Sequence, residues 1–234
     1  MRYFTHSQNI QQKVISFNDD QMHHMRKVLR LKLDDKVEFF DDKGTLYIVE
    51  IKKLSRDGSF GKIIEILHAD IESSKSFLTI MQVFPSSLAK LDLVIEKSTE
   101  LGADRFIFIK SKRSELKVMP SIDKLNRWKK IAIKASEQSL RLSVPEIYLF
   151  ENINEIELKD FDLKILLYEK SENLEWPSDI KAYKNILVTI GPEGGFEPQE
   201  VEEFRTLGFI DVKPFKNILR TETAPIATTA IIKN

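Results

Sequence analysis

A glycine-rich loop, GPEGGF (191–196), follows a six-residue apolar run, NILVTI (185–190), and precedes a helix-like stretch, EPQEVEEFRTL (197–207). A short buried strand, a glycine turn and a helix in this order are typical of an α/β fold, often with a nucleotide bound at the turn. The glycine spacing does not fit the dinucleotide fingerprint GxGxxG, and no GK[ST] follows as in a phosphate-binding P-loop. The loop therefore predicts either another ligand, held at close range by main-chain groups, or a strand-to-helix turn that binds nothing.

Strands and helices are expected to alternate from about residue 77 onward. Apolar residues recur at helical spacing over about 88–101, a stretch that Gly102 closes, and again over about 121–141. This alternation favours a mainly parallel sheet that is covered by helices on both faces. The expected strands are 77–84, 105–109, 164–168, 185–190 and 209–212.

Residues 1–72 favour β structure instead. Short runs rich in β-branched and aromatic residues are separated by turn signals such as DDKG (41–44). They predict a small barrel or compact sheet. The polar run IESSKS (71–76) is a candidate linker, so the predicted domains are 1–72 and 73–234. The runs are VISF (14–17), VEFF (37–40), LYIVEI (46–51) and GKIIEIL (61–67).

Composition excludes several classes of protein. The chain has no cysteine, so it forms no disulfide, no thiolate metal site and no cysteine nucleophile, and we expect no metal. It has neither an apolar run of 18 residues nor a signal peptide, which favours a cytoplasmic protein that does not act in a membrane. Its formal net charge is +0, so any nucleic-acid surface has to be a local basic patch.

A second loop, ILRTETA (218–224), lies between an apolar pair and a helix of small residues. Thr221 or Thr223 as a helix cap is the simplest explanation, but capping leaves Arg220 and Glu222 without a role. Both loops follow predicted strands, and ligands of open α/β sheets bind beyond the carboxyl ends of strands. The two loops are therefore candidates for one shared pocket.

The two loops resemble the cofactor-binding pair of the RsmE family of ribosomal-RNA methyltransferases, within the SPOUT superfamily. Three further blocks resemble that family in the same order, so the likeness extends over most of the chain. Departures are Leu140, where the family usually has Gly; Phe215-Lys216-Asn217, where it has Leu-Gly-Pro/Ser; Asp34-Asp35; and Ser111-Lys112. The blocks are HHMRKVLRLKLDD (23–35), KSTELGADRFIFIKSKRSE (97–115) and RWKKIAIKASEQSLRLSVPEI (127–147).

The resemblance implies an S-adenosyl-L-methionine-dependent enzyme that methylates N3 of a uridine in 16S ribosomal RNA, with the assembled small ribosomal subunit as the expected substrate. It also implies a PUA-like N-terminal β-barrel, a C-terminal α/β domain with a deep trefoil knot, and a homodimer. Two alternatives stay open: action on another RNA position, including transfer RNA, and a non-catalytic RNA-binding or ribosome-assembly module. A nicotinamide oxidoreductase is disfavoured by the glycine spacing.

The same resemblance implies roles for individual residues. We expect Arg220, Glu222 and Arg113 to be catalytic, although Arg113 as a phosphate contact and Arg220–Glu222 as an ion pair within the loop are the simpler alternatives. Glu193 belongs either to the chemistry or to the turn. The expected cofactor contacts are Tyr168, Glu169, Thr189, Ile190, Gly191, Pro192, Glu193, Gly194, Gly195, Ile218, Leu219, Arg220, Thr221 and Thr223. The expected RNA contacts are Arg2, His24, Arg26, Arg30, Lys112, Arg113 and Arg141.

Overall fold

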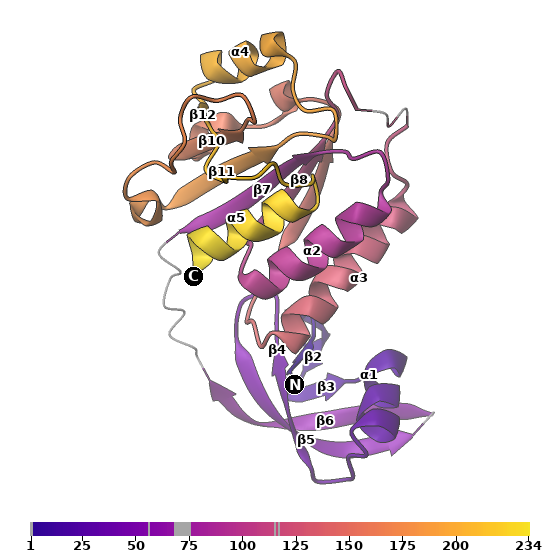
Figure 1. Ribbon diagram of the computed structural model, residues 1–234. Helices are drawn as coiled ribbons and strands as arrows, with labels where there is room; N and C mark the ends of the chain where they lie inside the picture. Colours follow the sequence, from indigo (N-terminus) through magenta and orange to yellow (C-terminus); the bar gives the residue numbers. More distant parts are fainter. Residues whose placement is uncertain (1, 56, 68–75, 115, 117) are drawn as a thin grey trace. The chain divides into compact units, whose positions relative to one another are not determined.

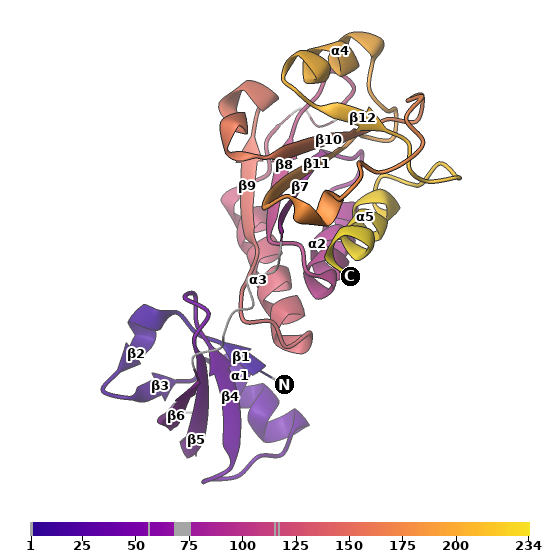
Figure 2. The same cartoon turned by 90° about the vertical axis from the view of Figure 1, so that its left-hand side faces the viewer.

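The computed structural model describes residues 2–55, 57–67, 76–114, 116 and 118–234. The chain divides into two compact units, residues 1–72 with 136–144 and residues 73–135 with 145–234 (Figures 1 and 2). The first unit thus takes in the end of a helix that begins in the second. Most of the candidate linker at 71–76 lies outside the described residues.

The first unit contains one six-stranded sheet with the strand order β1-β4-β5-β6-β3-β2. The β1–β4 pair is parallel and the other pairs are antiparallel. Helix α1 (Asp19–His23) begins at a capping box between Asn18 and Gln21 and continues into the π-helix η2 (His24–Val28). The strands are β1 (Arg2–Phe4), β2 (Ile10–Gln11), β3 (Val14–Ser16), β4 (Lys36–Phe40), β5 (Leu46–Ser55) and β6 (Gly58–Leu67).

The core of this unit requires a glycine in β6. Tyr3, Phe39 and Val49 are buried in one apolar cluster, and Gly61 lies directly against it. A Cβ atom on Gly61 would lie 2.5 Å from Cγ1 of Val49, 2.8 Å from Cζ of Phe17 and 2.9 Å from the backbone oxygen of Glu50. The close approach of β6 to its neighbours therefore leaves no room for a side chain at this position.

The second unit contains a six-stranded sheet with the order β12-β10-β11-β7-β8-β9, in which every pair is parallel. Its strands are β7 (Phe77–Val83), β8 (Arg105–Ile109), β9 (Glu146–Phe150), β10 (Leu163–Leu167), β11 (Asn185–Ile190) and β12 (Ile210–Val212). Its helices are α2 (Ala89–Leu101), α3 (Ile122–Gln138), α4 (Pro198–Thr206) and α5 (Thr223–Lys233), with the short 3₁₀ turns η3 (Ile153–Glu155), η4 (Leu158–Asp160) and η5 (Ile180–Ala182).

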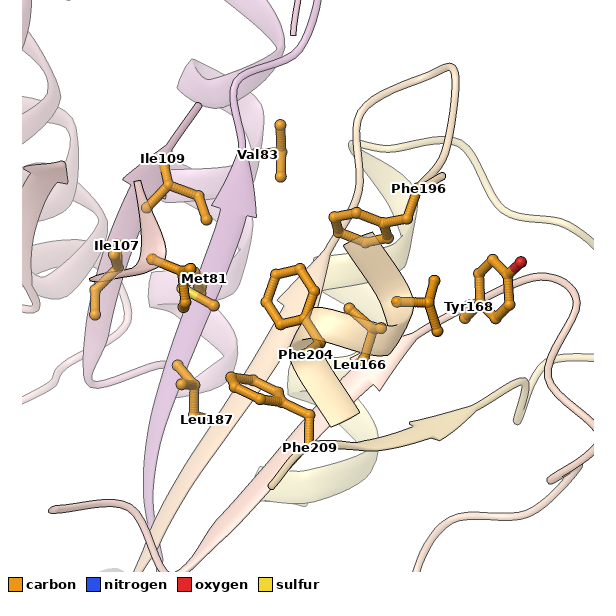
Figure 3. Close-up of a cluster of buried hydrophobic side chains, with 12 residues drawn as sticks. Met81, Val83, Ile107, Ile109, Leu166, Tyr168, Leu187, Phe196, Phe204 and Phe209 are labelled. Atoms are coloured by element: carbon orange, nitrogen blue, oxygen red, sulfur yellow. The ribbon is translucent and has the colours of Figure 1, made fainter. Parts of the chain in front are cut away.

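Helices cover both faces of this parallel sheet. On one face, Phe108 of β8 packs against the fully buried Trp128 of α3, with ring centroids 5.4 Å apart. Ile107 and Ile109 alternate with it and point to the other face, where they belong to the same core cluster as Phe204 of α4 (Figure 3). Helices α2 and α5 pack side by side (Figure 1). Within the described ranges, no helix is long and apolar enough to cross a membrane.

The predicted α/β class with a mainly parallel sheet and an N-terminal β domain is confirmed. Every strand and helix expected from periodicity forms at or within a few residues of its expected place, and Gly102 adopts the left-handed conformation that ends α2. The edge strand β9 was not expected; its Tyr148 is 41% exposed, so the run lacks the continuous apolar character of the central strands. The trefoil knot stays a prediction.

We predict that Gly61→Ala destabilises the first unit, because the new methyl group must displace Val49, Phe17 or the backbone of β5. Overpacking of this kind costs about 1–3 kcal/mol of unfolding free energy. Lys62→Ala, at an exposed neighbouring position of β6, is the matched control and should change stability by less than about 0.5 kcal/mol. Denaturant unfolding followed by circular dichroism measures both, and equal stability of the two variants would contradict the packing argument.

Candidate functional site

A cavity of about 580 Å³ opens where three parallel strands end. The last residues of β10, β11 and β12, which are Leu167, Ile190 and Val212, all line it. Its volume is in the range of small-molecule sites, and its place at the carboxyl ends of the strands is where open α/β sheets bind ligands. The rest of the wall consists of Tyr168 and Glu169 after β10, Gly191–Phe196 after β11, residues of 213–222 between β12 and α5, Ala224 of α5 and Lys90 of α2.

Two glycines of the 191–196 loop are required by its geometry. A Cβ on Gly191 would lie 2.9 Å from Cε2 of Phe196, whose ring is buried against Phe204 and anchors the loop in the core (Figure 3). Gly195 has φ +66°, and a Cβ there would lie 3.0 Å from Oε1 of Glu169. The loop is therefore a tight, anchored turn whose main chain stands directly at the cavity wall.

The two candidate loops are joined by a partly buried hydrogen bond, which is supported by two buried ones. Thr221 donates from Oγ1 to the carbonyl of Gly191 at 2.8 Å. Nε2 of Gln82, at the end of β7, donates to the carbonyl of Thr221 at 2.8 Å and to its Oγ1 at 3.0 Å. The alternative that Thr221 or Thr223 caps the following helix is wrong: Glu222 is the N-cap of α5, and no side chain makes a capping bond. Thr221 instead fixes one loop to the other.

Glu193 connects the glycine loop to the beginning of α2. Its carboxylate accepts hydrogen bonds from the backbone N–H of Ser86 at 3.0 Å, from Oγ of Ser86 at 2.8 Å and from Nζ of Lys90 at 2.6 Å. Burial acts to raise the pKa of Glu193, but the hydrogen bonds from Lys90 and Ser86 outweigh it and lower the pKa to about 2. At neutral pH Glu193 is therefore a carboxylate whose oxygens are already occupied by protein donors.

Arg113 lies beside the glycine loop but does not line the cavity. Its Nη1 donates to the carbonyl of Gly194 at 2.7 Å, and its Nε donates to Oε1 of Glu197 at 3.3 Å. The neighbouring backbone N–H of Lys112 donates at 3.1 Å to the buried Glu200, whose other oxygen accepts from the N-terminal end of α4. The segment after β8 is thus attached to the glycine loop and to α4 through side chains.

Arg220 and Glu222 form the ion pair that was the simpler alternative to a catalytic role, at long range, with 4.0 Å between Nη1 and Oε1. The Arg220 side chain is 85% exposed, whereas that of Glu222 is 15% exposed. Oε2 of Glu222 is buried and has no hydrogen-bond partner among the described residues, and Nζ of Lys90 lies 3.8 Å from it. Glu222 therefore lines the cavity with a side chain whose buried Oε2 has an unused capacity to accept a hydrogen bond.

Most of the expected cofactor contacts do meet at this cavity. The exceptions are Thr189, which is fully buried inside β11, and Thr223, which is exposed at the start of α5; neither lines the wall. Sequence reasoning missed several lining residues, most of which come from outside the two loops. The missed residues are Lys90, Leu167, Phe196, Val212, Lys213, Pro214, Phe215, Asn217 and Ala224. The sequence did single out Phe215 and Asn217, because both belong to the departures from the family pattern.

The expected RNA contacts in the first unit differ in how they are held. Arg26 and Arg30 are exposed in and just after η2. Arg2 pairs with Glu38 at 2.7 Å and donates to the carbonyl of Leu140, which has φ +60° at the position where glycine is usual. Arg2 is therefore fixed next to Arg141.

His24 has a structural partner in this unit. Its Nδ1 and the hydroxyl of Tyr3 are hydrogen-bonded at 2.8 Å. Burial, reinforced by the charge of Glu137, raises the pKa of Tyr3 to about 12. Tyr3 is therefore a neutral phenol at physiological pH, and its hydrogen bond fixes the orientation of the His24 ring. Lys112 and Arg113 belong to the second unit.

Comparison with known proteins agrees with this architecture. Residues 72–233 match the model of an RNA methyltransferase domain, and residues 17–64 match that of an RNA methyltransferase PUA domain. A protein of Bacillus subtilis named ribosomal RNA small subunit methyltransferase E is 30% identical over 99% of this chain and 95% of its own length. A protein of the same name from Buchnera aphidicola is 31% identical over 92% of this chain and 85% of its length.

Solved structures resemble the whole chain as well. The ribosomal RNA small subunit methyltransferase E of Neisseria gonorrhoeae, bound to S-adenosyl methionine, has a TM-score of 0.83 and 26% identity, covering 98% of this chain and 95% of that one. A probable rRNA-methyltransferase of Porphyromonas gingivalis has a TM-score of 0.85 and 26% identity, covering 99% and 96%. With its PUA domain, its parallel-sheet domain and relatives matched over nearly their full length, the chain belongs to the RNA methyltransferase family that includes ribosomal RNA small subunit methyltransferase E.

Proposed function

We propose that this protein uses S-adenosyl-L-methionine to methylate N3 of a uridine in the 16S RNA of the small ribosomal subunit. The observation that carries the proposal is the cavity between the glycine loop and the Arg220–Thr221 loop, which Thr221 joins into one wall. The names of the relatives from Bacillus subtilis and Buchnera aphidicola support the substrate class, and the ligand of the gonococcal structure supports the cofactor.

The residues at the cavity suit this cofactor. Glycines at 191 and 195 bring the main chain to the wall, so amide and carbonyl groups are available for an adenine or ribose edge. Glu169 is half-buried after β10 and is our candidate for the ribose hydroxyls, and Ile190, Leu219 and Ala224 add apolar surface. The other proposed contacts are Tyr168, Pro192, Glu193, Gly194, Ile218, Arg220 and Thr221.

When bound, the cofactor supplies an electrophilic methyl group on a positively charged sulfur. Because methyl transfer is an in-line displacement, the main task of the protein is to align donor and acceptor. We assign Glu222 to accept the N3 proton, since its side chain lines the cavity and its Oε2 makes no hydrogen bond with the described residues. Arg220 is assigned to the RNA side of the pocket mouth. Arg113 is assigned to hold the glycine loop through Gly194 and to meet a phosphate with its exposed part.

The RNA partner accounts for the basic residues outside the cavity. Phosphate contacts dominate RNA affinity, and Arg26, Arg30, Arg141 and Lys112 carry charges suited to them. His24 and Arg2 are held by other residues and are assigned to position this surface. We further propose that the enzyme acts as a cytoplasmic homodimer on the assembled subunit. Action on another RNA position, and RNA binding without turnover, are the competing functions.

A substitution at Gly195 tests the role of the glycine loop in cofactor binding. Gly195→Val should weaken binding of S-adenosylmethionine at least about tenfold, because a β-branched residue at φ +66° distorts the loop and meets Glu169. Gly208→Val is the matched control: φ is +83° there too, but the residue lies outside the cavity wall, so it should lose stability and keep its affinity. Isothermal calorimetry measures both, and unchanged affinity in Gly195→Val would remove the loop from the site.

Methyl transfer to RNA tests the proposed reaction and its target. Purified protein and labelled S-adenosylmethionine should label the RNA of unmethylated small subunits, and nucleoside analysis should identify 3-methyluridine. Methylation of a different nucleoside, or label appearing only in transfer RNA, would refute the proposed target. Cofactor binding without any label in RNA would favour the non-catalytic module instead.

A further inference from the structure

Lys90 is a cavity residue that no motif pointed to. It lies in the first turn of α2, more than a hundred residues before either loop, yet it lines the cavity between them. Nζ lies 2.6 Å from Oε1 of Glu193 in the glycine loop and 3.8 Å from Oε2 of Glu222 in the other loop. The ammonium group therefore stands next to the carboxylate that we assign to take the substrate proton.

The position of this ammonium is fixed by the protein. Glu193, which binds it, is itself held by the backbone and hydroxyl of Ser86, four residues before Lys90. A lysine that is fixed in this way loses little rotational freedom when it meets a ligand. It has three N–H donors, and Glu193 is its one hydrogen-bond acceptor among the described residues. Donors are therefore left for a group inside the cavity.

The other cations near the site are less suitable. Arg113 is engaged with Gly194 and Glu197 and does not line the cavity. Arg220 does line it, but its side chain is 85% exposed to solvent. Among the described lining residues, three are acidic and three are basic, so their formal charges cancel. A new negative charge in the cavity therefore has to be stabilised by a cation close to it. These six residues are Glu169, Glu193, Glu222, Lys90, Lys213 and Arg220.

The proposed reaction creates such a charge. When N3 of uracil loses its proton to Glu222, the electron pair left behind is shared by N3 and the adjacent carbonyl oxygens. N3 then forms a bond to the methyl carbon as the carbon–sulfur bond breaks, and the sulfur keeps that bond's electron pair and leaves as a neutral thioether. Proton transfer and methyl transfer use the same lone pair of N3, so the deprotonated base must persist between the two steps.

We propose that Lys90 is a catalytic residue that donates a hydrogen bond to a carbonyl oxygen of the target uracil beside N3 and stabilises the deprotonated base. A charge-assisted hydrogen bond that strengthens as the base becomes anionic lowers the barrier for the step. A donor to the C4 oxygen would also disfavour cytosine, which presents an amino group there, whereas a donor to the C2 oxygen would not distinguish the two bases. This role rests on the proposed function, because it assigns Lys90 to one step of the proposed methylation.

Substrates whose N3–H groups differ in acidity test the role of Lys90. Small subunits are reconstituted with RNA transcribed with either uridine or 5-fluorouridine, whose electron-withdrawing fluorine makes N3–H more acidic. Lys90→Met should lower the single-turnover rate on uridine about 100-fold, and the deficit should shrink on 5-fluorouridine. On uridine, the rate of the variant should keep rising with pH where that of the wild type has levelled off. Rates are compared at saturating S-adenosylmethionine, whose affinity is measured separately by calorimetry.

Two variants complete the experiment. Lys90→Arg keeps a cation and should recover the pH profile of the wild type. Lys213→Met removes a different cavity lysine and should keep the wild-type ratio of rates on the two RNAs, whatever its absolute rate. A Lys90→Met variant with the wild-type rate, or with an equal deficit on both RNAs at every pH, would overturn the proposal. Failure of the wild type to form 3-methyluridine would instead overturn the underlying function.

Discussion

The hydrogen bond from Thr221 to the carbonyl of Gly191 joins two segments that are 30 residues apart and makes one site of them. It depends on Gln82, which is fully buried at the end of the central strand β7 and binds both the carbonyl and the hydroxyl of Thr221. The strand register explains the arrangement, because Gln82 pairs with Ile190, the last residue before the glycine loop. A buried polar group that loses its partner costs about 1–3 kcal/mol, so these bonds favour one arrangement of the loops.

Charged side chains around this network mostly fix the loops to the scaffold. Glu193 attaches the glycine loop to α2, Arg113 attaches it to the segment after β8, and Glu200 attaches that segment to α4. Each of these groups is satisfied by protein partners, as buried or partly buried charges generally have to be. Glu222 differs, because its buried Oε2 has Lys90 at 3.8 Å but makes no hydrogen bond with the described residues. The site thus combines loops that are tied to the scaffold by side chains with a carboxylate oxygen that makes no hydrogen bond among the described residues.

Local sequence pattern was sufficient for most of the fold. Apolar runs and helical periodicity gave the places of β7, β8, β10, β11, α2 and α3, because burial on both faces of a parallel sheet leaves a continuous apolar signature. The two loops were found for a related reason: glycine and strand–loop–helix order are short-range signals. Their membership of one cavity followed from the rule that ligands bind beyond the carboxyl ends of strands, and the cavity lies there.

Local sequence pattern could not predict the contacts between distant segments. Lys90 and Glu193 are 103 residues apart, and Gln82 and Thr221 are 139 apart, so no local spacing signals either pair. Helix capping explained Thr221 equally well, since a threonine that caps a helix and one that joins two loops look the same in the local sequence. Glu193 looked like a candidate for chemistry because it lies in the middle of the glycine loop, and its donors, Ser86 and Lys90, lie 107 and 103 residues away along the chain, where no local pattern signals them.

The claim that the Thr221 hydroxyl assembles the cofactor site is tested most directly by calorimetric titration of S-adenosylmethionine into Thr221→Val. Valine keeps the shape of threonine and removes the donor to Gly191. Thr229→Val, in the same chain segment, removes a buried hydroxyl that bonds only within α5 and lies outside the cavity wall. The account predicts that Thr221→Val binds the cofactor at least about tenfold more weakly, which is about 1.4 kcal/mol, while Thr229→Val keeps the wild-type affinity. Equal affinity in the wild type and Thr221→Val would contradict it.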